Sequence, residues 1–128
     1  MQLPTEAVAD TALIEVVRLT APPSRSGRPF TGVPVGHWAA AEAESALTLI
    51  GSLPASTQHR CGFHPGWAAR AYEATLTLAL FEAQFCFSCH EVRLHGPAVP
   101  RRLATQFFDA EAPESRTLLD RFRAAAPA

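Results

Sequence analysis

An alternating pattern in the middle of the chain constrains the fold most. Between Phe81 and Ser88, apolar and polar side chains follow one another in the run Phe-Glu-Ala-Gln-Phe-Cys-Phe-Ser. Successive residues of a β-strand point to opposite faces, so this period of two predicts a half-buried strand. Leu76, Leu78 and Leu80 alternate with the opposite parity, so a turn or bulge must separate the two sets or the first set must lie in the turn region. The segment therefore predicts a β-hairpin.

The same region has a second interpretation. Its Ala, Leu and Glu content over Trp67–Phe85 would permit one long helix, with Tyr72 and Leu76 on the same side. We favour the hairpin, with its turn near Thr75, and keep a largely helical domain as the alternative.

Four further segments have recognisable patterns. Ala12–Leu19 is short, rich in β-branched residues and typical of a strand. Phe30–Trp38 contains glycines and Pro34, which favour an edge strand or an irregular extended segment. Ala39–Gly51 and Pro113–Ala126 have apolar residues at helical spacing and predict two helices.

These segments predict a single α+β domain over residues 1–128, with residues 1–11 and 124–128 frayed. A chain of 128 residues has the size of one domain. We expect an antiparallel sheet of about four or five strands with two helices on one face, in the order β-β-α-β-β-α. The expected core residues are Ile14, Val16, Leu47, Ile50, Phe81, Phe85, Phe87, Leu118 and Phe122.

Composition and charge narrow the class of partner. The 11 basic residues are all arginine, are scattered along the chain and leave a net charge of −1. Nucleic-acid binding normally needs a basic stripe, so we expect no nucleic-acid partner. No run reaches the roughly 18 apolar residues of a membrane span, and Met1–Glu6 does not resemble a secretory signal. The sequence predicts a soluble cytoplasmic protein that binds an unidentified protein or small molecule.

The clearest chemical feature is a cysteine–histidine cluster. A hairpin that turns near residue 75 would place Cys61 opposite Cys89. The same hairpin would place His64 opposite Cys86. Zinc takes four nitrogen or sulfur ligands, whereas the two cysteine motifs, Cys61–Gly66 and Phe85–His90, contain none of the carboxylates that calcium or magnesium need. If a metal is bound, we therefore expect zinc, held by Cys61, His64, Cys86 and Cys89, with His90 as the substitute ligand. Because Cys86 and Cys89 would point to opposite faces of a straight strand, Phe87-Ser88 would have to turn tightly.

Other interpretations of the cluster stay open. Cys86-Phe87-Ser88-Cys89-His90 fits the haem-attachment pattern C-x-x-C-H, but no export signal accompanies it and the single methionine is Met1. Cys86 and Cys89 could cycle between dithiol and disulfide. The ordinary interpretation is that the cysteines are small buried side chains, able to form a cross-strand disulfide only under oxidising conditions.

A resemblance supports the hairpin. Cys61, Pro65 and Arg70, followed by the apolar run Phe85–Val92, resemble a group of small bacterial proteins. These carry a Cys…Pro…Arg stretch and then a hydrophobic strand that ends in Cys-Phe-x-Cys. The resemblance covers about residues 28–96 and implies an extended hairpin around the two cysteine motifs, but no activity, cofactor or site. The chain has one extra residue between Cys61 and Pro65 and a longer, leucine-rich turn, so we expect a register within a few residues of the one that a turn near Thr75 gives.

Two classes of function follow. The first is a non-catalytic binding or accessory domain with structural cysteines, with or without zinc. The alternative is a thiol-dependent redox protein that uses Cys86 and Cys89. A thiol nucleophile, Cys61, with His64 as its base is conceivable, but no catalytic signature accompanies it. We favour the first class, because no predicted helix start or basic neighbour would activate a thiol.

Overall fold

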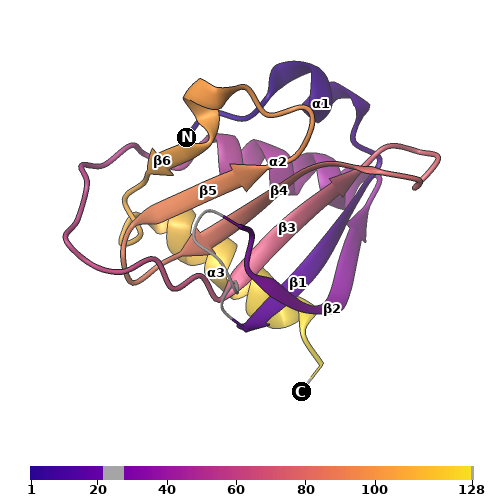
Figure 1. Ribbon diagram of the computed structural model, residues 1–128. Helices are drawn as coiled ribbons and strands as arrows, with labels where there is room; N and C mark the ends of the chain where they lie inside the picture. The colour runs from indigo at the N-terminus through magenta and orange to yellow at the C-terminus, as the bar shows by residue number, and fades with distance from the viewer. Residues whose placement is uncertain (22–27, 128) are drawn as a thin grey trace.

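The computed structural model describes residues 1–21 and 28–127. A six-stranded antiparallel sheet in the order β2-β1-β3-β4-β5-β6 forms the centre of the fold (Figure 1). The strands are β1 (Leu13–Ala21), β2 (Thr31–Ala39), β3 (Trp67–Tyr72), β4 (Ala79–Cys86), β5 (Glu91–His95) and β6 (Thr105–Phe107). The helices are α1 (Thr5–Asp10), α2 (Ala41–Gly51) and α3 (Pro113–Ala125), with a 3-10 turn, η1, at Arg101–Leu103. Within the described ranges, no helix has the length and apolar character needed to cross a membrane.

The α+β class and the antiparallel sheet are confirmed, but the predicted number of elements is too low. The described residues form six strands and three α-helices, and the predicted order lacks α1, β5 and β6. β6 has three residues and α1 has six, too few to show a clear periodic pattern. β2 lies at the sheet edge, as Pro34 predicts. The ends predicted to be frayed, 1–11 and 124–128, include α1 and the end of α3, and Ala128 lies outside the described residues.

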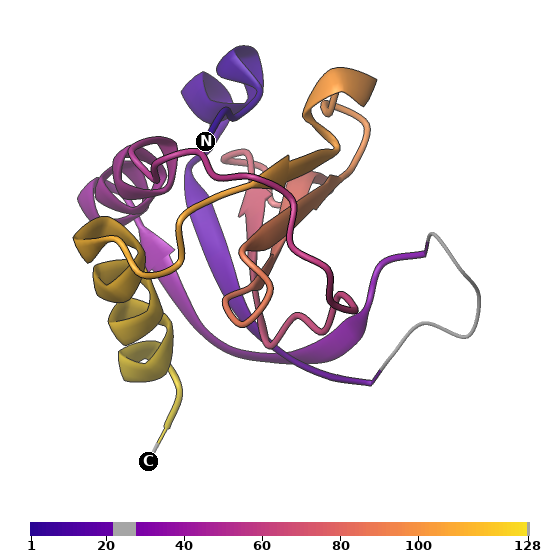
Figure 2. The same cartoon turned by 90° about the vertical axis from the view of Figure 1, so that its left-hand side faces the viewer.

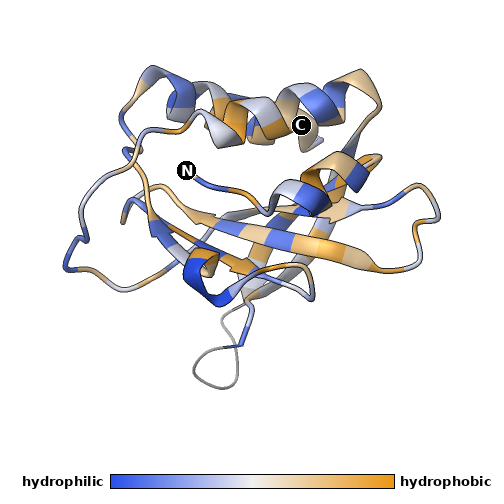
Figure 3. Ribbon diagram, turned by 90° about the horizontal axis from the view of Figure 1, so that it is seen from above, coloured by the Kyte–Doolittle hydropathy of each residue, from blue (hydrophilic) through white to orange (hydrophobic). Residues whose placement is uncertain are grey.

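The two longer helices cover one face of the sheet, as predicted. α2 and α3 lie side by side on that face (Figures 2 and 3). Eight of the nine predicted core residues are buried and Phe87 is half-buried, so the predicted core is essentially the observed one. Phe122 of α3 is fully buried and stacks on Trp38 and Trp67, with ring centroids 5.5 and 5.6 Å away. This aromatic group joins α3 to the sheet.

β3 and β4 form the predicted hairpin, so the alternative of one helix over Trp67–Phe85 is wrong. Thr75 lies in the connection between the two strands. Trp67 pairs with Phe85, two positions beyond the partner that a turn centred on Thr75 would give it.

A bulge in β4 separates the two alternating sets of side chains. Ala71 pairs with Phe81. The next residue, Tyr72, pairs with Ala79, so Leu80 is the extra residue of a bulge. This bulge is why the alternation of apolar residues changes from even-numbered to odd-numbered positions between Leu80 and Phe81. The predicted turn or bulge is confirmed.

The opposite face of the sheet, here called the helix-free face, bears no α-helix in the described parts of the chain (Figure 3). Phe30, just before β2, packs there against Val17 and Ala68. Phe63, in the loop between α2 and β3, packs against Cys86 and also touches Phe30. Two loops therefore supply a thin apolar cover over part of this face.

Candidate functional site

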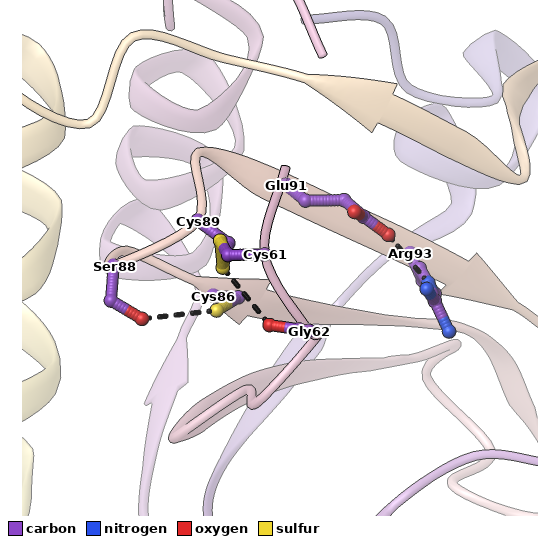
Figure 4. Close-up of a disulfide and its surroundings, with 7 residues drawn as sticks. All are labelled: Cys61, Gly62, Cys86, Ser88, Cys89, Glu91 and Arg93. Carbon is purple, nitrogen blue, oxygen red and sulfur yellow. Dashed lines mark hydrogen bonds and ion pairs between the residues drawn. A yellow bond between two sulfur atoms is a disulfide. The ribbon is translucent and has the colours of Figure 1, made fainter. Parts of the chain in front are cut away.

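The structure joins two of the four predicted metal ligands in a disulfide. Cys61, in the loop between α2 and β3, is bonded to Cys89, in the turn between β4 and β5 (Figure 4). Their Cα atoms are 6.0 Å apart, and Cys89 Sγ lies 2.9 Å from the carbonyl oxygen of Gly62. These are the two cysteines that the predicted hairpin brings together.

The third cysteine lies beside this disulfide with a free thiol. Cys86 is the last residue of β4, is 1% exposed and packs in one apolar cluster with Cys89 and Phe63. Its Sγ atom lies 3.4 Å from the hydroxyl oxygen of Ser88 (Figure 4). Cys86 thus occupies the environment of a small buried apolar residue.

Neither predicted histidine ligand joins the cysteines in a metal-binding group within the described residues. His64 is exposed, and its ring lies close to Gly62. A Cβ atom placed on Gly62 would be only 2.9 Å from Nε2 of His64. His90, the predicted substitute ligand, accepts a hydrogen bond at Nδ1 from the N–H of Ala110, at 3.0 Å. Its ring stacks on His59, with centroids 4.1 Å apart. His90 therefore holds two loop segments together.

The predicted zinc site is not assembled in this disulfide-bonded form. Across residues 1–21 and 28–127, no group of three or more His, Cys, Asp or Glu side chains is arranged to hold a metal ion. Zinc binds thiolates, whereas the sulfur atoms of Cys61 and Cys89 are bonded to each other. The zinc hypothesis therefore concerns only the reduced chain, for which it stays a prediction.

A tight turn allows Cys86 and Cys89 to approach the same cluster. β4 ends at Cys86 and β5 begins at Glu91, so Phe87–His90 forms the connection. His90 has a φ of 55°, in the left-handed region that histidine enters more readily than most residues other than glycine. The turn is therefore made without a glycine.

A second feature of the helix-free face is a charged row that crosses the sheet. Glu15 of β1 pairs with Arg70 of β3, which pairs with Glu82 of β4, which pairs with His95 of β5. Arg70 donates hydrogen bonds through Nε to Glu82 Oε1, at 2.6 Å, and through Nη1 to Glu15 Oε1, at 2.8 Å. Burial lowers the pKa of Arg70, but Glu82 and, after it, Tyr72 together outweigh burial through hydrogen bonds and charge and raise the pKa overall. The guanidinium therefore stays charged between the two carboxylates.

Gln84 links this row to the loop that precedes β2. Its side chain is fully buried on β4, and its Nε2 atom donates to Glu82 Oε2 and, at 2.9 Å, to the carbonyl oxygen of Phe30. The Phe30 N–H in turn donates to Gln84 Oε1, at 3.1 Å. The two reciprocal hydrogen bonds hold the backbone of Phe30 against the sheet.

A cavity of about 630 Å³ lies beside the charged row, between the segment around Phe30 and the adjoining ends of β4 and β5. Its charged or ionisable lining residues are Arg28, Arg70, Glu82 and His95, Thr31 adds a hydroxyl group, and its larger apolar residues include Phe30, Leu78, Phe81 and Pro97. Burial lowers the pKa of His95, with Arg93 acting in the same direction and Glu82 opposing them, so the imidazole is neutral near pH 7. The cavity combines apolar walls with a few convergent polar groups.

Sequence reasoning found the cysteine pair but missed the charged row. Glu15 and Arg70 are 55 residues apart, and only the pairing of β1 with β3 makes them neighbours. The alternation in β4 already placed Glu82 on the polar face of its strand. Its partners follow only from the strand order and register, which no local pattern contains.

Comparison of the chain with protein-family models, with curated proteins and with solved structures finds no match. The resemblance to the small bacterial proteins therefore stays a prediction, and the site has to be interpreted from its own geometry.

Proposed function

We propose that this chain is a non-catalytic binding domain whose ligand site is the cavity on the helix-free face. The observation that carries the proposal is a space of about 630 Å³ with apolar walls beside the Arg70–Glu82 ion pair. Pockets that bind small molecules commonly measure roughly 300–1,000 Å³ and combine apolar walls with a few placed polar groups. The partner class is therefore a small organic molecule.

The hydrogen bonding of the charged row favours binding over catalysis. A general base needs a carboxylate oxygen within reach of a substrate proton. Glu82 already accepts from Arg70 on one oxygen and from Gln84 on the other. A carboxylate held in this way serves as a fixed structural charge.

The disulfide supports the cavity wall. It ties the loop before β3 to the β4–β5 turn, and that loop carries Phe63. The ring of Phe63 meets the ring of Phe30 edge-on, with centroids 5.7 Å apart, and Phe30 lines the cavity. In the proposed function the cysteines are structural, because they hold the loop that backs Phe30.

The redox alternative needs Cys86 and Cys89 to act as a pair. Two observations favour the structural role: Cys89 is bonded to Cys61 and Cys86 is only 1% exposed. Alkylation of the native oxidised protein with iodoacetamide distinguishes the two. We expect Cys86 to react far more slowly than a free thiol in a peptide, whereas rapid labelling near neutral pH would favour the redox function.

Zinc belongs to the proposal only for the reduced chain. Reduction would free Cys61 and Cys89 beside Cys86, and three clustered thiols are suitable zinc ligands. Elemental analysis of chelator-free reduced protein tests this, with Cys89→Ser as the control. A stoichiometry far below one zinc per chain, or a variant equal to wild type in bound metal, would eliminate the zinc site.

The binding function is tested by an NMR screen of small organic compounds against the oxidised, ¹⁵N-labelled protein. We expect hits to shift the amides of the non-proline residues that line the cavity, such as Phe30, Gly32, Leu78, Glu82 and His95. A diverse set that produces no such hits, or hits only at α2 and α3, would contradict the proposed function.

A further inference from the structure

The side chains that line the cavity have N–H donors that are free to bind a ligand. Arginine has five N–H donors. Arg70 uses one on Nε for Glu82 and one on Nη1 for Glu15, and a side-chain hydrogen bond with Tyr72 uses a third, which leaves two. His95 makes no hydrogen bond within residues 1–21 and 28–127, so its neutral ring offers one N–H. Glu82, in contrast, already accepts one hydrogen bond on each of its oxygens. A ligand that presents acceptor oxygens would complement these groups.

The charge of the lining also favours a ligand with acceptor oxygens. Arg28 and Arg70 are positive, Glu82 is negative and His95 is neutral, so the lining carries one net positive charge. Glu15 lies outside the lining and also accepts from Arg70, at Nη1, so Arg70 has two carboxylate partners. The attraction for an anionic group therefore comes from Arg28 and from the remaining N–H donors of Arg70 and His95.

The apolar walls indicate the rest of the ligand. Leu78 lines the cavity and is 66% exposed, the largest exposed fraction among the exposed large apolar side chains of the described residues. Phe30 and Pro97 also line the cavity. Apolar surface of this kind is stabilised by contact with an apolar group that displaces water. A hydrocarbon chain or ring would provide that contact.

We propose that the cavity binds an amphipathic carboxylate, a small molecule with one carboxylate group and an apolar chain or ring. The carboxylate lies at Arg28, Arg70 and His95, and the apolar part lies against Phe30 and Leu78. This inference rests on the proposed binding function and specifies its ligand class.

Isothermal titration of the oxidised full-length chain with octanoate, octylamine and octanol tests the charge preference. We expect octanoate to bind at least about tenfold more tightly than octylamine, because only the carboxylate pairs with the free donors. Hexanoate should bind more weakly than octanoate, by up to about fourfold for each methylene group removed.

Paired variants locate the two ends of the ligand. Arg28→Gln should weaken octanoate binding by about three- to fivefold, while Arg116→Gln, at an exposed arginine of α3, should leave it unchanged. Leu78→Ser should weaken it by about tenfold, whereas Val33→Ser, at another exposed apolar position, should not.

The outcomes separate this inference from the proposed function. Tighter binding of octylamine or octanol than of octanoate overturns the ligand class, while binding at the cavity remains. Absence of octanoate binding, or equal losses in the control variants, also overturns the inference. The NMR screen then decides independently whether the cavity binds small molecules of another class.

Discussion

Replacing Cys61 by serine removes one cross-link and little else, because this side chain is exposed. The two bonded cysteines are 28 residues apart in the sequence. The chain-entropy relation for a closed loop of that length gives about 12 cal/mol/K, or about 3.6 kcal/mol at 25 °C. We therefore expect Cys61→Ser to lower the free energy of unfolding of the oxidised protein by about 3.6 kcal/mol. For a chain of this size, that is a fall in Tm of about 13 °C.

Urea unfolding of wild type and variant, each with and without reductant, measures this loss as a thermodynamic cycle. In reductant the two proteins should unfold at the same urea concentration, since neither then has the cross-link. Without reductant only the wild type should shift, to higher urea. Equal midpoints without reductant would refute the reasoning, because the bond would then not constrain the unfolded chain. A difference that persists in reductant would assign the effect to the serine side chain.

Three further predictions test the packing and charge arguments. Phe122→Ala should cost about 3–5 kcal/mol of unfolding free energy in urea, because a fully buried ring in an aromatic group is lost. Arg123→Ala, an exposed change on the same helix, should stay within about 0.5 kcal/mol, and similar losses from both would contradict the packing. Arg70→Met should cost about 2 kcal/mol by leaving Glu82, whose side chain is 12% exposed, without its cation. Adding Glu82→Gln should recover part of that loss, and additive losses would count against the coupling of the pair. Burial lowers the pKa of His95 in the folded state, so the unfolded chain takes up the proton first as the pH falls. Wild type should therefore lose stability relative to His95→Gln as the pH falls from about 7 through the folded pKa of His95, and parallel pH profiles would refute this.

Local patterns in the sequence were sufficient for the main elements. The alternation before the β4–β5 turn predicted a half-buried strand, and the apolar spacing in Pro113–Ala126 predicted α3 to within a residue. Both signals extend over two or more periods and agree with the face that the element buries. The three residues of β6 carry no such signal, and pairing with β5 determines their conformation.

The local patterns did not predict the strand register or the contacts between residues far apart in the sequence. The β3–β4 pairing lies two positions from the predicted register, and the bulge at Leu80 accounts for one of them. The same alternation had indicated an irregularity there. Cys61 and Cys89 nevertheless meet, because both lie in connections beyond the strand ends. The charged row depends on β1 lying between β2 and β3, a matter of topology that no single segment determines.

The proposed ligand site is tested most directly by identifying the residues that a bound ligand contacts. Isotope-filtered NOE measurements on oxidised ¹³C-labelled protein with octanoate observe those contacts. If octanoate binds in the cavity, its chain gives NOEs to the methyl groups of Leu78 and to the ring of Phe30, because both residues line the cavity. NOEs confined to residues outside the cavity, such as Leu119 of α3 or Leu49 of α2, would contradict the proposed ligand site.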